Sequence, residues 1–483
     1  MNNKVNTKRK EYSQQLPKWK LLNDVCSAGD EAIKNGRTDY LPMPNPKDTS
    51  EENQARYDQY VARAVFYNAT GRTLRGSVGL AFNKYPTLTL PTILDYLQTD
   101  CDGAGVSIYQ QSQSALTQVL KLGRHCLFVD YPKTNGEVSI AQKKQAYLRP
   151  HIVSIDTEQV INWRTEKVGG VTKLTLVVIQ ESKETYDEFA TQSEIQYRVL
   201  SLDKNGYRVR IFDKDCEPTG EDYYPTDATG SKWDIIPFVF IGSENNDADI
   251  DEPPLLDLAN LNLAHYRNSA DYEDSVFFNG QAQPFISGLS EEWRDHLEDK
   301  KIYAGSRSVM LLPEGGNYGY AQPQPNTLVK EAMVTKETQM IALGAKLIER
   351  TTNVKTATQV NSEDSASHSV LSLCANNVSD AYRLALSWCC RYEGVSFECD
   401  YEISQEYSDN KLDPQLLTAL VGAWQQGAIP QSQLLRNLRQ FDMIDPELTD
   451  EELLDELESE SNADVELDNE LGNELNNDET ETA

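Results

Sequence analysis

Residues 253–278 read PPLLDLANLNLAHYRNSADYEDSVFF, with two prolines at the start and neither Gly nor Pro afterwards. Proline is tolerated in the first turn of a helix and is unfavourable inside one. The stretch therefore predicts one helix over 255–278, about 37 Å long at about 1.5 Å per residue. Asn279-Gly280 follows it, and such residues commonly end a helix.

A second long helix is predicted over 327–350, because this segment is rich in Ala, Lys, Glu, Met and Leu. The segment 279–326 separates the two helices. It contains the strand-like runs QPFIS (283–287) and RSVMLLP (307–313) on either side of a short predicted helix at 290–300. The two long helices thus bracket a small α+β unit.

Upstream, helix and strand patterns alternate. Apolar residues spaced three and four apart predict a helix over 51–78, and the three glycines of 71–79 predict a change to a turn-rich region before Pro86. A helix over 105–122 and a strand at 125–131 follow. From 151 to 241, five short β-rich runs separated by Gly, Asp and Asn predict an antiparallel sheet.

Downstream, segment 351–369 is dominated by Thr, Ser and Asn and predicts an exposed loop. A helix over 370–392, a strand at 395–403 and a helical pair at 414–428 and 431–442 follow. After Glu458, the run of Asp, Glu and Asn lacks the apolar surface needed to fold alone.

The charge balance disfavours a protein that binds nucleic acid tightly. The 483 residues include 45 Lys plus Arg against 76 Asp plus Glu, a net charge of −31. From Asp442 to Ala483 there are 18 acidic residues and no Lys or Arg; subtracting these 18 charges from −31 leaves −13 for the rest. Tight binding of DNA phosphates instead needs clustered Lys and Arg.

No apolar run approaches the roughly 20 residues that cross a bilayer, so no membrane span is expected. The basic N-terminus has no apolar core of the secretory-signal type. The chain has eight cysteines, and two of them, at 389 and 390, are adjacent. This pattern favours reduced thiols over disulfides, and therefore a protein made in a reducing cytoplasm.

The sequence offers no motif for chemistry. It contains no G-x-x-x-x-G-K-[ST] loop, H-E-x-x-H, C-x-x-C or G-x-S-x-G. We therefore predict no catalytic residues, no metal site and no cofactor. A dispersed active site stays an open alternative, because a catalytic triad assembles from distant segments.

The order of these parts resembles that of a tailed bacteriophage portal protein, the subunit of the head-to-tail connector. The resemblance covers about residues 40 to 450, and its motifs are specific together although each is weak alone. The matching motifs are Phe66-Tyr67-Asn68, Thr70-Gly71-Arg72, Gly76, Gly123-Arg124, Val129-Asp130-Tyr131-Pro132, Ile161-Asn162-Trp163, IPFVFIG (236–242), PPLLDLANLNLAHYRNSAD (253–271), LGAKLIER (343–350) and TATQ (356–359).

The resemblance implies an α+β fold of portal-like architecture, with a mixed α/β wing, long stem helices, a small α+β clip and a helical crown. By order along the chain, the implied parts are the wing at 1–251, first stem helix at 252–278, clip at 279–326, second stem helix at 327–350, tunnel loop at 351–369, wing return helix and strand at 370–404, crown at 405–457 and acidic disordered tail at 458–483. The family offers no role for the tail.

The resemblance also implies a function without enzymatic activity. The chain would form a ring of identical subunits, typically a dodecamer, at one capsid vertex of the virion, assembled in the host bacterial cytoplasm. Double-stranded DNA would pass through the channel during genome packaging and ejection without sequence-specific binding. Implied partners are the large terminase motor, head-completion or tail proteins, and major capsid and scaffold proteins, with no membrane. Net negative charge suits a channel through which DNA slides.

Three sets of candidate site residues follow, each with a plainer alternative. The first set is basic and would face the channel: Lys330, Lys336, Lys346, Arg350 and Lys355. Alternatively, these residues are solvated or form salt bridges between subunits.

The second set is polar, lies in the loop and would touch the DNA backbone: Asn353, Thr356, Thr358 and Gln359. Alternatively, the loop is an ordinary connector. The third set is aromatic and would anchor partners at the clip: Trp293, Tyr303, Tyr318 and Tyr320. Alternatively, these aromatic residues belong to the core.

Two other classes of protein compete with this interpretation. One is a structural capsid or scaffold-type virion protein without a DNA channel, which would not form closed rings. The other is an enzyme with a dispersed active site, which would need a pocket that joins polar side chains from several segments. The absence of catalytic motifs disfavours the enzyme most.

Overall fold

The computed structural model describes residues 4–132, 147–187, 189–220, 222–280, 283–300, 312, 314–321, 327–347 and 369–405, together with 422, 430 and 435. The chain divides into two units, Met1–Gln405 and Glu406–Ala483. The fold described here is that of the first unit. The predicted helical pair at 414–442, the crown and the acidic tail lie almost wholly outside the described residues.

The N-terminal region is helical, and one prediction for it is wrong. Helices α1 (Lys10–Asn23) and α2 (Asp30–Asn35), joined by a π-helical turn (Asp24–Ala28), precede α3 (Glu51–Arg63) and α4 (Ala69–Ala81). The single helix predicted over 51–78 is therefore divided. The side chain of Asn68 starts α4 by accepting a hydrogen bond from the Gly71 N–H at 2.8 Å.

The turn-rich region predicted before Pro86 is observed only at residues 82–84, because α4 runs through all three glycines to Ala81. Gly71 is needed for close packing: a Cβ there would lie 2.8 Å from the Cys26 carbonyl oxygen. Nothing lies within 4 Å of the Cβ positions at Gly76 and Gly79. Leu74 and Val78 bury the inner face of α4.

The first sheet has the order β3-β2-β8 and is antiparallel. Its strands are β2 (Arg124–Asp130), β3 (His151–Ile155) and β8 (Phe238–Gly242). Helices α5 (Ile108–Leu122) and α10 (Val370–Glu393) contact β2, and α10 also contacts β8. The helices predicted at 105–122 and 370–392 and the strand at 125–131 are thus confirmed. A capping box formed by Ser107 and Gln110 begins α5.

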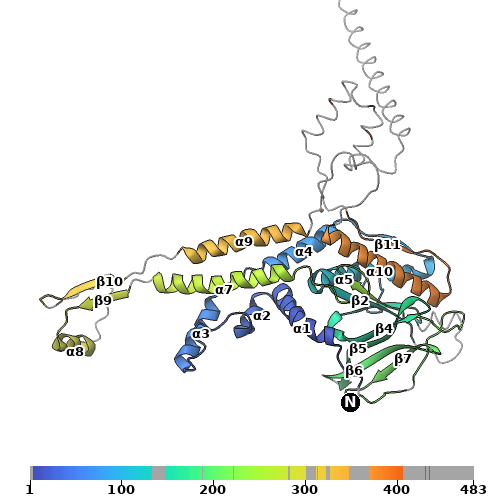
Figure 1. Cartoon of the computed structure of the whole chain (residues 1–483), viewed down its shortest axis with the longest axis horizontal. Helices are drawn as coiled ribbons and strands as arrows, with labels where there is room; N and C mark the ends of the chain where they lie inside the picture. The colour runs from blue at the N-terminus through green and yellow to red at the C-terminus, as the bar shows by residue number, and fades with distance from the viewer. Residues whose placement is uncertain are drawn as a thin grey trace, which may run out of the picture. The chain divides into compact units, whose positions relative to one another are not determined.

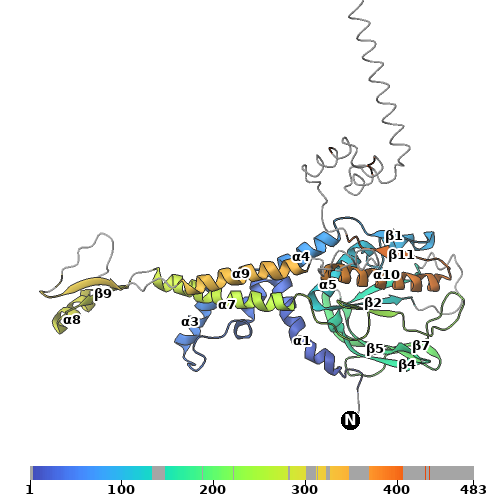
Figure 2. The same ribbon diagram turned by 45° about the horizontal axis from the view of Figure 1, so that its top comes forward.

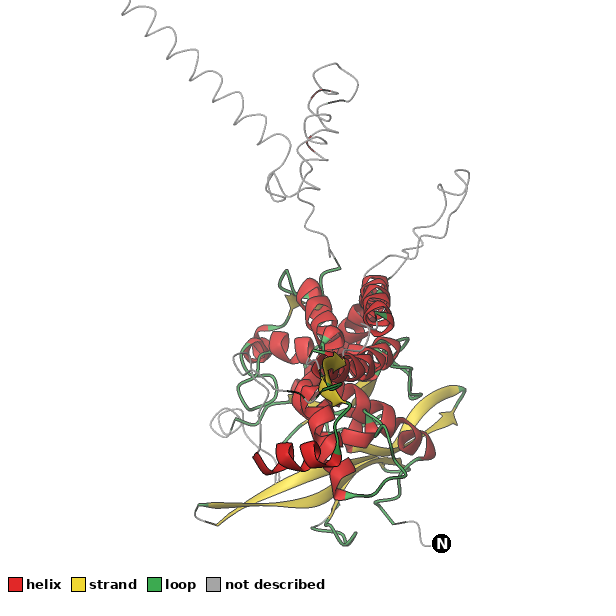
Figure 3. Cartoon of the chain, turned by 90° about the vertical axis from the view of Figure 1, so that its left-hand side faces the viewer, coloured by secondary structure: helices red, strands yellow, loops and turns green. Residues whose placement is uncertain are grey.

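The second sheet is an antiparallel meander of β4 (Val160–Val168), β5 (Val171–Asp187), β6 (Ala190–Asp203) and β7 (Gly206–Phe212). The predicted antiparallel pairing is confirmed, although the β-rich region contributes to two sheets instead of one. Strands drawn in yellow extend beyond the helices in Figure 3. The Arg124 guanidinium is buried between the sheets, 4.3 Å from the Trp163 ring and 3.7 Å from that of Phe240.

The long helix predicted over 255–278 is observed as α7 (Leu256–Asn279), and that predicted over 327–350 as α9 (Leu328–Lys346). The two lie side by side (Figures 1 and 2). Between them come β9 (Gln283–Ser287), α8 (Glu291–Lys300) and β10 (Asn317–Ala321), with β9 and β10 paired antiparallel. The sequence did not predict β10, and the strand predicted at 307–313 lies outside the described residues except for Leu312.

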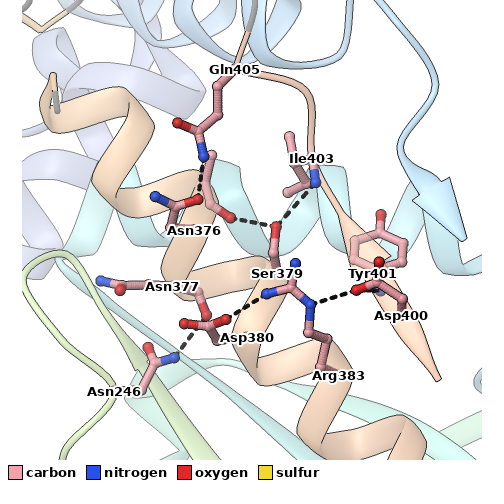
Figure 4. A network of polar contacts seen from close by, with 11 residues as sticks. Asn246, Asn376, Asn377, Ser379, Asp380, Arg383, Asp400, Tyr401, Ile403 and Gln405 are labelled. Carbon is pink, nitrogen blue, oxygen red and sulfur yellow. Dashed lines mark hydrogen bonds and ion pairs between the residues drawn. The ribbon is translucent and has the colours of Figure 1, made fainter. Parts of the chain in front are cut away.

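The strand predicted at 395–403 is observed only at β11 (Asp400–Glu402), which pairs with β1 (Thr87–Thr89). Polar contacts hold this segment on α10 (Figure 4). Arg383 donates to Asp380 and Asp400, each at 2.7 Å, and the Ile403 N–H donates to Ser379 Oγ at 3.0 Å. Shorter helical turns are η2 (Arg37–Asp39), η3 (Thr92–Gln98) and η4 (Thr157–Gln159). The fold class is α+β.

Candidate functional site

Helix α7 is fixed to the helical region by a buried asparagine. Asn262 Oδ1 accepts hydrogen bonds from the Thr70 N–H at 3.1 Å and from the Thr70 hydroxyl at 3.0 Å. Its Nδ2 donates to the Tyr67 carbonyl at 2.7 Å. Asn262 and Thr70 have no exposed surface. One side chain therefore satisfies three polar groups at the start of α4, a region where unpaired groups are costly.

Further along α7, Ser269 and Asp271 make polar contacts with α3 and the residues that follow it. Ser269 Oγ accepts from the Val65 N–H at 3.1 Å and donates to the Val65 carbonyl at 2.7 Å. The Tyr60 hydroxyl donates to Asp271 at 2.6 Å, and burial together with this carboxylate raises the pKa of Tyr60. Ser269 therefore ties the chain between α3 and α4 to the face of α7 that carries Asn262, and Asp271 holds the end of α3 from another side of α7.

A polar contact links α7 to the packed helix α9. His265 Nε2 lies 3.2 Å from Glu337 Oε1, and the His265 ring lies 6.0 Å from that of Tyr67. The His265 side chain is almost fully buried, whereas the Glu337 side chain is 46% exposed. The histidine therefore links α9 to the surface that anchors α7.

Most of α9 is uncovered. Met340 is its one buried residue among the 19 of the helix, and Leu347 directly after the helix is also buried. Three large apolar side chains are instead exposed, Leu328 at 69%, Val334 at 51% and Ile341 at 74%. At the end of α7, Phe277 and Phe278 are half exposed, with Arg63 4.4 Å above the Phe277 ring.

The end of α9 meets the start of α10. The Leu371 N–H donates to the Leu347 carbonyl oxygen at 3.1 Å, and the Ser369 side chain caps α10 by accepting from the Ser372 N–H at 3.1 Å. The residues on either side of segment 348–368, which is not described, therefore lie next to each other. The predicted tunnel loop falls within this segment, apart from Ser369.

The structure describes three of the five predicted basic channel residues. Lys330 and Lys346 are exposed and Lys336 is half-buried, and within the described part of the chain no ion pair involves them. At about 100° per residue, Lys336 and Lys346 point about 80° apart around α9, while Lys330 points about 160° away from Lys346. The three lysines therefore do not form one stripe.

The remaining predicted channel residues lie outside the described residues. They are Arg350, Asn353, Lys355, Thr356, Thr358 and Gln359.

The predicted clip residues are partly brought together. Tyr318 and Tyr320 lie two apart on β10, so their side chains share a face. Their hydroxyls are 2.9 Å apart and their rings meet edge to face at 5.2 Å. The hydrogen bond that Tyr318 donates to Tyr320 raises the pKa of Tyr318. Trp293 is half-buried on α8, and Tyr303 lies outside the described residues.

Sequence reasoning missed the anchors of α7. Asn262, His265 and Ser269 are spaced three and four residues apart, so they share one face of the helix. All three are buried. A polar stripe at helical spacing inside an otherwise apolar segment was the available signal, because buried polar side chains are almost always hydrogen-bonded.

No group of three or more His, Cys, Asp or Glu side chains among the described residues is placed to hold a metal ion. All eight cysteines are free thiols. Among the described helices, none combines the length and apolarity needed to cross a membrane.

Comparison with known proteins gives little further detail. A domain of unknown function (DUF4055) matches residues 254–393, from just before α7 to the end of α10. No curated protein matches the chain. Solved structures are similar at low identity, among them the following two. The neck of an empty GTA particle computed with C6 symmetry has a TM-score of 0.39 and 14% identity, covering 80% of this chain and 93% of the other. The neck of a native GTA particle computed with C12 symmetry has a TM-score of 0.39 and 13% identity, covering 84% and 98%. At this TM-score neither identifies what the chain does.

Proposed function

We propose that this chain is a portal protein without enzymatic activity, a structural subunit that forms a closed ring at one vertex of a tailed phage capsid. The observation that carries the proposal is the uncovered α9, which exposes Leu328, Val334 and Ile341 along one helix. Helices in proteins owe most of their stability to the packing of an apolar face. In a ring, copies of the chain supply that packing for one another.

The order of elements supports the same assignment. In it, α7 and α9 are the stem helices, β9, α8 and β10 form the clip, and the sheets with α1–α5 and α10 form the wing. Single chains that expose so much apolar surface on one element commonly bind another protein there. A second copy of the chain is the simplest partner, because no other protein is required. Repeated head-to-tail contacts between copies close into a ring when the rotation between them allows it.

Within the ring, we place DNA in a central channel lined by α9 and by the segment 348–368. Lys336 and Lys346 are the described lysines that lie nearest to one face of α9. A few cations in a chain of net charge −31 would guide the DNA backbone without holding it tightly. The terminase motor and head-completion proteins would bind the clip, where Tyr318 and Tyr320 form a paired aromatic surface. The protein would belong to the virion.

The decisive experiment is electron microscopy of the purified full chain together with its mass in solution. We expect closed rings with a central hole and a mass that is a whole multiple of 54.4 kDa. A chain that stays monomeric alone is to be co-expressed with the scaffold and capsid proteins before imaging. Assemblies without a central hole would contradict the proposal and favour a capsid or scaffold protein.

Replacement of Lys346 by Glu should leave rings intact and reduce DNA packaging several-fold, because the substitution places a negative charge beside the DNA backbone in every subunit. Packaged DNA per particle is the measurement. Lys204→Glu, the same substitution at an exposed turn between β6 and β7, is the matched control and should package normally. Normal packaging by Lys346→Glu in intact rings would show that Lys346 does not face the DNA.

A further inference from the structure

The second sheet carries a two-stranded arm. β4 pairs with β5 only as far as Ile179, and β7 pairs with β6 only from Tyr197 onward. Among the described residues, 181–187 and 190–196 therefore pair only with each other, and we name this pair the β5–β6 ribbon. At about 3.3 Å per residue, the ribbon reaches about 23 Å beyond the sheet.

The ribbon has an acidic and aromatic tip. Phe189 is fully exposed and Tyr186 is 74% exposed. The sequence 183–189, KETYDEF, carries three acidic residues and one lysine. A two-stranded ribbon alone is marginally stable in water, and aromatic side chains at a tip gain most when a partner covers them. These features are those of an arm that binds another surface.

A cleft lined by four basic residues crosses one face of the same sheet. It has a volume of about 860 Å³. Asn162, Val178, Val199 and Arg210 lie in register across the four strands and form its floor. The N-terminal segment 4–9 forms one wall and is held to β4, since the Arg9 N–H donates to the Ile161 carbonyl at 2.9 Å. The turn at 215–217 also lines the cleft.

The lining of the cleft is richer in basic than in acidic side chains, unlike the chain as a whole. Its four basic residues outnumber its two acidic ones, Asp215 and Glu217. Two of the basic residues, Arg9 and Arg164, are paired with Glu11 and Glu166, at 3.1 and 3.0 Å.

The other two basic residues, Lys4 and Arg210, have no ion pair within the described ranges. The Arg210 guanidinium lies 5.6 Å from the half-buried Phe212 ring, which offers an apolar contact beside the charge.

We propose that the β5–β6 ribbon of one copy occupies this cleft on the neighbouring copy in the ring. The acidic, aromatic tip complements a cleft with unpaired cations and a partly exposed phenylalanine. The ribbon cannot reach its own cleft, because β5 and β6 run unbroken from the cleft floor at Val178 and Val199 into the ribbon. The contact joins two different surfaces, which is the type that closes into rings. This inference rests on the proposed ring.

Cross-linking of the full chain tests the contact. Cys216 lines the cleft, is partly exposed and is a free thiol, and Ala190 lies at the exposed tip of the ribbon. We expect Ala190→Cys treated with a short bismaleimide to give covalent dimers and higher multimers, with residue 190 joined to Cys216 in the peptide masses. Ala190→Cys combined with Cys216→Ser should lose these products. Ala104→Cys, at another exposed alanine, is the matched control and should not react with Cys216.

Charge reversal gives an independent measurement. Arg210→Glu alone and Glu184→Arg alone should each lower the fraction of chains in rings several-fold, and the double variant should restore it because each copy carries both halves of the contact. Lys4→Glu tests the cleft without changing the sheet. Rings that form normally in all of these variants, without the cross-link between residues 190 and 216, would overturn this inference and leave the ring itself intact. Absence of any ring would instead overturn the proposed function.

Discussion

Replacement of Asn262 by Ala should lower the free energy of unfolding of the first unit by about 3–5 kcal/mol. The substitution leaves the Thr70 N–H and the Thr70 hydroxyl without their partner in a fully buried place. It also removes one of the two donors to the Tyr67 carbonyl, which keeps the Ala69 N–H at 2.7 Å. Each unsatisfied buried group costs about 1–3 kcal/mol. Urea unfolding of variant and parent at equal protein concentration is the measurement, because assembly itself raises apparent stability.

Asn260→Ala is the matched control for this experiment. Asn260 lies two residues earlier on α7 and is exposed. The same substitution there should change stability by no more than about 0.5 kcal/mol, as is usual for surface positions. Equal effects of the two substitutions would show that helix propensity, and not the buried hydrogen bonds, accounts for the result with Asn262.

The role of Asn262 also explains why α7 can act as a rigid element. The helix makes polar contacts with the chain between α3 and α4 at Asn262 and again at Ser269, two turns later. His265 lies between them and reaches Glu337 on α9. In the proposed ring, these contacts would pass a load applied to α9 on to α7 and to the helical region. That is a useful property in a subunit that we propose to carry the stress of DNA packaging.

The long helices were predictable because their signals are local. From Leu255 to Phe278 no residue breaks a helix, and the observed α7 differs by one residue at each end. The break between α3 and α4 was not predictable in the same way. It depends on Val65 and Tyr67 bonding to α7, a helix about 200 residues later in the sequence. Tertiary contacts of this kind override local propensity.

The glycines of α4 are another case in which tertiary contacts override the local sequence signal. Three glycines in nine residues usually indicate turns. Gly71 is a glycine within a helix because Cys26 and Asn68 lie too close for a side chain there, which no local pattern reveals. The β9–β10 pairing is another example, since β10 contains Gly319, and a Cβ there would lie 2.8 Å from the Phe285 ring across the pair.

The candidate site was predicted only in outline. The sequence located α9 and its basic residues, but a list of lysines does not fix their directions. Lys330 and Lys346 point about 160° apart around α9, and this angle follows once both residues are known to lie within the observed bounds of the helix. The aromatic pair of Tyr318 and Tyr320 was found by residue type, and its shared face follows from strand geometry once β10 is known.

Replacement of Ile341 by Lys should abolish closed rings and leave a folded single chain. Ile341 is 74% exposed in one copy, so a lysine there should change the stability of that copy by no more than about 0.5 kcal/mol. In the proposed ring the same position is covered by the neighbouring copy, where an unpaired buried charge costs several kcal/mol. That cost recurs at every contact around the ring. Mass in solution and electron microscopy are the measurements, with circular dichroism to confirm the fold.

Ile93→Lys separates this effect from a general effect of added charge. Ile93 is a half-exposed isoleucine in η3, away from the proposed stem helices, and its replacement should leave rings unchanged. Rings formed normally by Ile341→Lys would mean that the exposed face of α9 does not lie between subunits. The apolar residues of α9 would then need another partner, and the central reason for placing α9 at the channel would be lost. Loss of rings in Ile341→Lys alone, with an unchanged circular dichroism spectrum, is the result that the packing of α9 leads us to expect.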